Sequence, residues 1–138
     1  MLLMPRKVKY RKSQKGKVRG IAMSGNRLHF GEYGLKALEN GLVKGGHIEA
    51  SRVVVARKLK GAGKFWVNIF PHKPVTKKPP ETRMGKGKGD LSHWVAVVKR
   101  GRVVFELSGV PEDFARYVFR LVAFKLPVKT RFITRNET

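Results

Sequence analysis

The first twenty residues contain eight lysines and arginines and neither aspartate nor glutamate. The cations are Arg6, Lys7, Lys9, Arg11, Lys12, Lys15, Lys17 and Arg19. Such a segment cannot form a hydrophobic core, because its like charges repel one another and few apolar side chains separate them. We therefore expect residues 1–20 to form a basic arm, in which Tyr10 is the aromatic ring, attached to a single domain over residues 21–138.

The excess of positive charge continues through the rest of the chain. The 138 residues include 31 Lys and Arg against 9 Asp and Glu, which gives a net charge of +22. A chain this basic is expected to be neutralised by a polyanion, which could be nucleic acid, an anionic membrane or an acidic protein. Hydrophobic residues make up 41% of the sequence, so a modest core can also form.

Several classes of protein are excluded or disfavoured by what the sequence lacks. It contains no cysteine, so disulfides and thiolate-bound zinc are excluded. No apolar run approaches the roughly 18 residues that a membrane-spanning helix needs. The apolar start, residues 1–4, is too short for a secretory signal. We expect a soluble intracellular protein.

A second basic segment, residues 83–89, alternates glycine with lysine as Arg-Met-Gly-Lys-Gly-Lys-Gly. It falls in the stretch 72–90, which is rich in proline and glycine and has no apolar periodicity, so an extended loop is expected there. Glycines on alternate positions let backbone N–H groups and lysines approach phosphates closely. The segment is not a nucleotide-binding P-loop, because no Ser or Thr follows Lys86 or Lys88.

Hydrophobic patterning predicts a fold of the α+β class, with a mostly antiparallel sheet and two helices. Residues 47–60 fit a helix and a strand almost equally well, because the β-branched run 53–55 competes with a helical spacing of apolar residues. The remaining expectations are a half-buried strand at 27–30, a strand at 64–70, a hairpin of strands 94–99 and 102–107 around a two-residue turn, a helix at 111–126 and a last strand at 128–134.

No constellation of residues suggests catalysis or a bound metal. The histidines at 29, 47, 72 and 93 lack metal-ligand spacing, and the few carboxylates form no acid–base pair. We therefore expect no enzyme activity, no metal and no cofactor. Trp66 and Phe70 share one face of their strand with Asn68, and core packing is favoured for these aromatic rings over stacking on nucleic-acid bases.

The order of several short stretches resembles one family along essentially the whole chain. The stretches are 5–12, 30–39, 48–52, 63–74, 83–89, 94–98, 109–112 and 125–130. They are similar to the bacterial-type large-subunit ribosomal protein sixteen, the L-sixteen family, which is related to the archaeal and eukaryotic ten-e proteins. The segment Arg-Met-Gly-Lys-Gly-Lys-Gly is the most specific part of the resemblance. The family usually carries Arg where Asn68 stands and Asp where His72 stands.

The resemblance implies an α/β sandwich of the hammerhead type, with residues 47–60 helical. It also implies a non-catalytic structural constituent of the large ribosomal subunit, on a bacterial cytoplasmic or an organellar ribosome. Such a protein binds large-subunit rRNA near the base of the central protuberance and contacts neighbouring ribosomal proteins. It helps to form the A-site tRNA-binding region beside the peptidyl-transferase centre, with the P-site as a further candidate. No membrane contact and no homo-oligomer are expected.

The same resemblance implies that one set of residues faces tRNA and another set binds rRNA. The tRNA-facing residues are Arg83, Met84, Gly85, Lys86, Gly87 and Lys88. The rRNA-binding residues are the eight arm cations and Tyr10, together with Arg52, Arg57 and Lys58. Phosphate and shape recognition should dominate over base reading, because lysines and glycine backbone outnumber side chains suited to base edges.

Three other readings stay open at the level of the sequence. A DNA-binding protein would need an element that enters a groove, and the tip of the 94–107 hairpin is a weak candidate. An enzyme acting on RNA would need clustered acids or a cofactor loop. A membrane-surface helix would need more cations on the polar face of the 111–126 helix.

Overall fold

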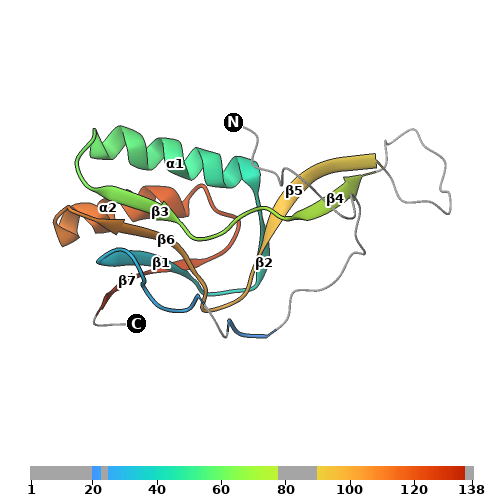
Figure 1. Ribbon diagram of the computed structural model, residues 1–138, viewed down its shortest axis with the longest axis horizontal. Coiled ribbons are helices and arrows are strands. Elements are labelled where there is room, and N and C mark those ends of the chain that lie inside the picture. The colour runs from blue at the N-terminus through green and yellow to red at the C-terminus, as the bar shows by residue number, and fades with distance from the viewer. Residues whose placement is uncertain (1–19, 23–24, 78–89, 136–138) are drawn as a thin grey trace.

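A computed structural model of the chain describes residues 20–22, 25–77 and 90–135. These residues form two antiparallel sheets and two helices (Figure 1). The four-stranded sheet has the order β3 (Lys64–Val67), β6 (Val103–Ser108), β1 (Tyr33–Ala37), β7 (Thr130–Thr134). The three-stranded sheet has the order β2 (Gly41–Lys44), β5 (Asp90–Val98), β4 (Lys73–Lys77). The expected α+β class is confirmed.

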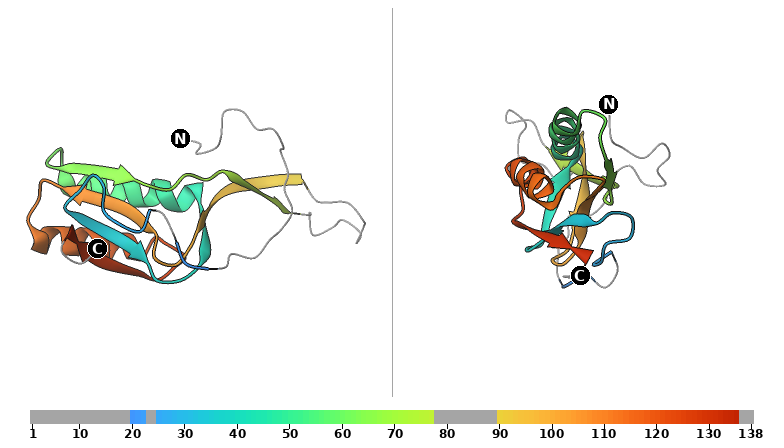
Figure 2. Two further views of the ribbon diagram at one scale, coloured as in Figure 1. Left: turned by 60° about the horizontal axis from the view of Figure 1, so that its bottom comes forward. Right: turned by 90° about the vertical axis from the view of Figure 1, so that its left-hand side faces the viewer.

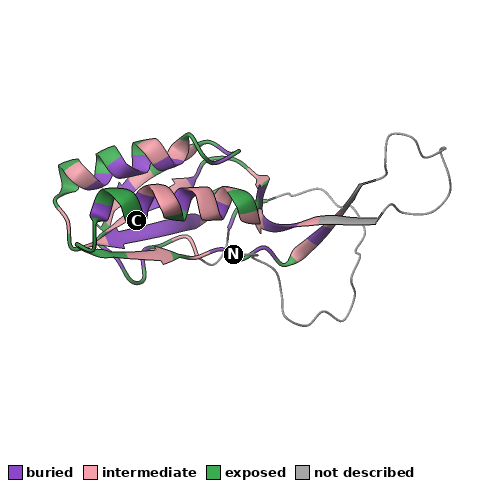
Figure 3. Cartoon of the chain, turned by 90° about the horizontal axis from the view of Figure 1, so that it is seen from above, coloured by how far each residue is buried: buried purple, intermediate pink, exposed green. Residues whose placement is uncertain are grey.

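Helices α1 (Gly45–Leu59) and α2 (Glu112–Ala123) lie side by side on one face of the four-stranded sheet (Figure 2, right). Each helix turns a stripe of buried residues towards the sheet, and buried and exposed segments alternate along both helices in Figure 3. The stripe of α1 contains Ile48, Val55 and Leu59, and that of α2 contains Ala115, Val118, Phe119 and Val122. The helical spacing of these residues prevails over the β-branched run 53–55, because only a helix buries all three of the α1 residues on one side.

Strand β6 is the centre of the core. Residues 103–107 are all fully buried, including the carboxylate residue Glu106. β1 pairs with one edge of β6 and β3 with the other, so its backbone is satisfied on both sides. The helices cover one face of the four-stranded sheet, and the segment 25–31 crosses the opposite face, which we call the outer face.

The predicted hairpin of strands 94–99 and 102–107 is wrong. β5 pairs with β2 and β4, whereas β6 pairs with β1 and β3, so the two strands belong to different sheets. The turn between them is present, and the N–H of Arg102 donates to the carbonyl of Lys99. However, the Gly101 N–H donates to the carbonyl of Ala37, and the Ala37 N–H donates to the carbonyl of Arg102. The turn therefore pairs with the end of β1 and directs the chain from the three-stranded sheet into the four-stranded sheet.

The predicted strand at 27–30 is also wrong. The segment is bent, with Leu28 buried and Phe30 60% exposed, and its N–H groups do not join a neighbouring strand. The N–H groups of His29, Phe30 and Gly31 all donate to one oxygen of Glu106 instead. Successive N–H groups of a strand point in opposite directions, so three of them converging on one atom is incompatible with extended backbone.

The strand predicted at 64–70 ends earlier, at Val67, and Asn68 turns its side chain towards Glu106. The expected loop at 72–90 needs correction at its ends, because residues 73–77 form β4 and Asp90 begins β5. Pro74 is tolerated in β4 because β4 is an edge strand, where one side of the backbone needs no sheet partner. The predicted helix 111–126 and last strand 128–134 are confirmed as α2 and β7, with small shifts of their ends.

Strands β4 and β5 form a ribbon that projects away from the helices (Figure 1). Lys77 pairs with Asp90 at the end of the described ribbon. The segment 78–89, which contains the alternating glycines and lysines, starts and finishes at this pair and lies outside the described residues. Within the described part of the chain, neither helix combines the length and the apolar character that crossing a membrane requires.

Candidate nucleic-acid interface

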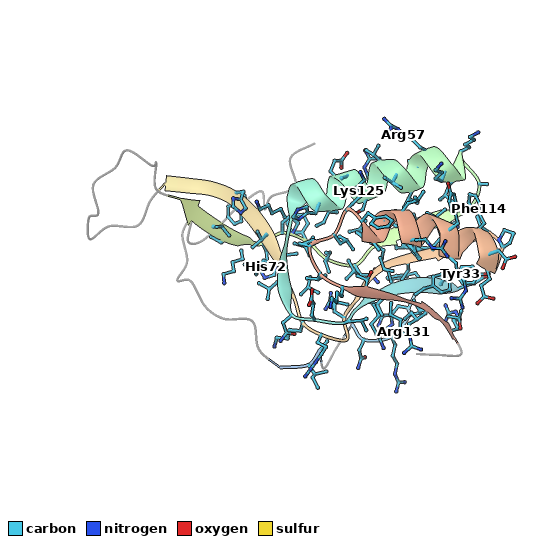
Figure 4. The ribbon with its side chains drawn as sticks, turned by 180° about the vertical axis from the view of Figure 1, so that it is seen from behind. Tyr33, Arg57, His72, Phe114, Lys125 and Arg131 are labelled. Carbon is cyan, nitrogen blue, oxygen red and sulfur yellow. The ribbon has the colours of Figure 1, made fainter. Side chains whose placement is uncertain are left out.

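The described residues hold three of the residues predicted to bind rRNA, all on α1. Arg52, Arg57 and Lys58 are exposed, as expected for cations that contact a partner. Figure 4 shows Arg57 on the side of α1 that faces away from α2 and the sheet. Residues on a helix are separated by about 100° each, so Arg52 and Lys58 stand about a third of a turn apart, on opposite flanks of the buried stripe. Arg57 points away from the core between them. The three cations therefore do not form one cluster and would meet different parts of a surrounding partner.

Arg52 is held in place by Glu49, one turn earlier on α1. Its Nε donates to Glu49 Oε2 at 3.1 Å and its Nη2 to Glu49 Oε1 at 2.6 Å. This contact raises the pKa of Arg52 and lowers the pKa of Glu49, because each charge favours the other. The planar guanidinium keeps further donors that can reach a phosphate.

The Arg52–Glu49 pair borders a groove of about 310 Å³ between α1 and the chain after β3. Ile48, Val67, Ile69, Phe70 and Pro71 supply most of its lining. Phe70 is 48% exposed there, so the expectation that this ring packs in the core is wrong. Phe65 does pack in the core, with its ring 5.3 Å from that of Phe105.

The other two helix cations differ in how firmly they are held. The Lys58 ammonium lies 5.5 Å from the centre of the Tyr117 ring on α2, a cation–π contact that joins the two helices. On α2 itself, Arg116 contacts both Glu112, at 3.3 Å, and the face of the Phe132 ring, at 4.5 Å. Among the described residues, Arg57 has neither an ion pair nor a cation–π contact. Of the three α1 cations, it is therefore the one most available to bind a partner.

His47 has a structural role at the start of α1. The backbone N–H of Lys44 donates to His47 Nδ1 at 3.1 Å, which satisfies a donor at the helix N-terminus. Burial lowers the pKa of His47, and the positive charge of Lys44 lowers it further, so the neutral ring that accepts this bond is favoured. Within residues 20–22, 25–77 and 90–135, no group of His, Asp or Glu could hold a metal ion.

Glu106 organises a polar cluster on the outer face that the sequence did not reveal. Its Oε1 accepts the N–H groups of His29, Phe30 and Gly31 at 2.9, 2.9 and 3.0 Å. Its Oε2 accepts the Asn68 amide at 2.5 Å. Arg102 Nη2 donates to the Asn68 carbonyl at 2.7 Å and extends the cluster. Glu106 is the lone acid in an otherwise apolar run, residues 103–107, and that is the one signal in the sequence that could have drawn attention to it.

The hydrogen bonds of this cluster decide the ionisation of Glu106. Burial alone would raise the pKa of the carboxyl, because a charge is costly away from water. The Gly31 N–H, the Asn68 amide, and the Phe30 and His29 N–H groups outweigh burial and hold the pKa below its ordinary value. Glu106 is therefore an anion at neutral pH, and it fixes the segment 29–31 against the sheet.

The arm cations Arg6 to Arg19, Tyr10 and the predicted tRNA-facing residues 83–88 lie outside the described residues. Comparison with known proteins does cover them. The sequence matches the family described as Ribosomal protein L16p/L10e over residues 5–133. The chain belongs to this ribosomal protein family. It is also 57% identical, over 136 residues and 99% of each chain, to the large ribosomal subunit protein uL16 of Sulfurihydrogenibium sp. (strain YO3AOP1).

Family membership confirms the resemblance that the short stretches indicated, and it confirms that the chain is a ribosomal protein and not an enzyme. It also gives the charge a context. Nine acids cannot neutralise 31 cations, so most of the positive charge has to be balanced by something outside the chain, and a ribosomal protein is surrounded by RNA phosphates.

Proposed function

We propose that this protein is a structural constituent of the large ribosomal subunit that binds large-subunit rRNA through its basic arm and α1. The match of residues 5–133 to the L16p/L10e family carries this proposal, because it spans both basic segments and nearly all of the described domain. The net charge of +22 and the exposed cations of α1 support it independently. The relative from Sulfurihydrogenibium supports a place on a bacterial cytoplasmic ribosome.

The finer part of the proposal places rRNA contacts near the base of the central protuberance and the loop at 83–88 beside the A-site tRNA. The β4–β5 ribbon supports it, because the ribbon projects from the domain and its paired end, Lys77 with Asp90, is where the loop begins and ends. A loop presented in this way can reach a second RNA while α1 contacts the first. Neighbouring large-subunit proteins are the remaining partners.

Crosslinking of the tagged protein in its native cells, followed by sequencing of the bound RNA, tests this function. We expect reads concentrated in large-subunit rRNA and tRNA. Reads spread over messenger RNA, or recovered mainly from DNA, would contradict the assignment.

The division of labour between the two basic segments can be tested separately. Deleting residues 1–20 should weaken rRNA binding and flatten its dependence on salt, by about 0.7 to 0.9 in log–log slope for each phosphate that the arm no longer neutralises. The melting temperature of the domain should change little, because a segment with this excess of cations is not expected to contribute to a hydrophobic core. An unaltered slope would show that the arm does not contact phosphates.

The double substitution Lys86→Ala with Lys88→Ala should leave incorporation into subunits intact and weaken A-site tRNA binding. The matched control is Lys58→Ala with Arg57→Ala on α1, which should weaken rRNA binding instead. Loss of the Lys86/Lys88 variant from subunits, with unchanged tRNA affinity per intact ribosome, would contradict the placement of the loop.

DNA binding is disfavoured by the corrected topology. The weak candidate for a groove-reading arm was the tip of the 94–107 hairpin, and β5 and β6 do not form that hairpin. The Ala22 N–H donates to the Arg100 carbonyl and the Arg100 N–H to the Asn40 side chain, so the turn is held against the domain. A salt-titrated competition between structured RNA and duplex DNA should favour the RNA.

A further inference from the structure

The outer face of the four-stranded sheet carries a pair of stacked aromatic rings. Phe30 lies on Trp66 with ring centres 5.9 Å apart and planes 21° from parallel, and His29 meets the edge of Phe30 at 6.3 Å. Phe30 is 60% exposed, so one face of its ring is open while the other is covered. A ring this exposed does little for the core, and a flat open ring on a second ring is a suitable surface for another flat group.

Strand register places this pair on the outer face. Trp66 pairs with Glu106, and Glu106 pairs with Gly34 of β1, so these three positions form one row across the sheet. The absence of a side chain at Gly34 leaves room for Leu28, which packs against Ile133 of the same row and against the nearby Val103. Leu28 thereby anchors the segment that carries Phe30. Figure 2 (left) shows the course of the chain that leads into β1.

The position of Phe30 is fixed before any partner arrives. Its backbone N–H, and those of His29 and Gly31, are held by the buried Glu106 carboxylate, which Asn68 secures from the other side. A rigid ring loses little conformational entropy when it contacts a ligand, so this arrangement favours binding.

Charge on the same face selects the kind of partner. Strand alternation puts Lys64 beside Trp66 on the outer face, and the pairing of Lys36 with Arg131 puts both of these on it as well. Arg27, in the crossing segment, is also exposed. The exposed acid nearby is Glu32. Open aromatic rings bordered by cations match a nucleobase with its flanking phosphates better than they match an apolar peptide.

We propose that the outer face is a second RNA-binding surface, in which an unpaired base of rRNA stacks on the open face of Phe30 while Lys64 and Arg27 contact the adjoining phosphates. It lies across the sheet from α1, so it adds a contact that the α1 residues do not supply, and its residues are not among those predicted for the arm or the loop. The inference rests on the proposed function, because it requires that the protein binds rRNA.

The test compares full-length variants for binding to protein-free large-subunit rRNA over a range of salt concentrations. Phe30→Leu keeps apolar bulk without a flat ring, and it should weaken binding at least about fivefold, the lower end of what loss of a base-stacking ring costs. Phe30→Tyr keeps the ring and should bind as the wild type does. Phe124→Leu is the matched control, because Phe124 is 80% exposed and follows α2 on the opposite layer, and it should change nothing. The salt slope should be the same for all of them, since every phosphate-binding cation is retained.

Ultraviolet crosslinking of the wild-type protein to the same RNA, followed by mass spectrometry, gives a readout that does not depend on the stability of any variant. We expect a crosslinked nucleotide on the peptide that contains Phe30. Unchanged affinity for Phe30→Leu together with no crosslink there would overturn the inference.

The failure of this inference can be separated from failure of the proposed function. If the wild type binds rRNA and deletion of residues 1–20 flattens the salt slope, the function stands whatever Phe30 does. If Phe30→Leu binds free rRNA normally but fails to join subunits depleted of this protein, the face contacts a neighbouring protein, and the RNA inference is wrong.

Discussion

Replacing Glu106 by glutamine tests whether one buried carboxylate holds the outer face together. Glu106→Gln keeps the shape of the side chain and removes its charge. The three hydrogen bonds from residues 29–31 then become neutral ones, and hydrogen bonds to a charged group contribute about 1 kcal/mol more than neutral ones. The new amide group would also face the Asn68 amide, which places two donors together. Burying a neutral group costs less than burying a charge, so the net loss should be about 2 to 3 kcal/mol at pH 7.

Urea unfolding followed by circular dichroism measures this loss. For a domain of this size the midpoint should fall by about 1 M or more at an unchanged slope. Glu49→Gln is the matched control, because it makes the same chemical change at an exposed ion pair, where the effect should be far smaller. An unchanged midpoint for Glu106→Gln would refute the role assigned to the carboxylate.

The pH dependence provides a second check with a defined sign. The folded-state pKa of Glu106 lies below its unfolded value of about 4.3, so the folded protein is the weaker proton binder. The stability contributed by the charge is complete above the unfolded pKa and is lost as pH falls through the folded pKa. The gap between wild type and Glu106→Gln should therefore be constant from pH 7 to about pH 5.5 and shrink below about pH 4.5. A gap that widens in acid would contradict the assignment.

Further substitutions should separate close packing from local conformation. A Cβ on Gly31 would lie 2.7 Å from the Leu107 carbonyl oxygen, a backbone atom that cannot move aside, so Gly31→Ala should destabilise the domain by about 2 to 4 kcal/mol in urea unfolding. Gly46→Ala, on an open position of α1, should instead raise the unfolding free energy by about 0.5 to 1 kcal/mol, and a loss there would contradict the assigned helix. His47→Ala removes the acceptor for the Lys44 N–H and should cost about 1 kcal/mol at pH 8. Because the pKa of His47 is lowered in the folded state, this cost should decrease as pH falls below about 6.5, and a cost independent of pH would exclude a neutral ring as the acceptor.

Several elements were determined by the local sequence alone. Pro111 and two acids precede a regular apolar stripe, which specified α2 almost to its ends. β-Branched and aromatic residues after Pro127 favoured the strand β7, and the excess of cations specified a polyanionic partner without any knowledge of the fold. These properties depend on composition or on residues close together in the chain, where spacing and propensity act directly.

Which sheet a strand joins was decided only by the tertiary structure. The two-residue turn at Arg100–Gly101 is real, and its sequence is typical of a hairpin. The pairing of Gly101 and Arg102 with Ala37 diverts β6 into the other sheet, and nothing near the turn records that preference. Tertiary structure also decided between helix and strand for residues 47–60. The segment is helical because only a helix buries Ile48, Val55 and Leu59 on one side.

The outer face shows most clearly the difference between what the local sequence determines and what the tertiary structure decides. Leu28 and Phe30 alternate with polar residues as a strand does, yet the segment is bent, because Glu106 lies 75 to 77 residues away in the chain and takes three successive N–H groups. The sequence supplied a lone acid within an apolar run and an exposed phenylalanine, with no local link between them. Only the folded sheet brings the carboxylate to that backbone, because its buried charge needs hydrogen-bond donors and the bent segment offers them.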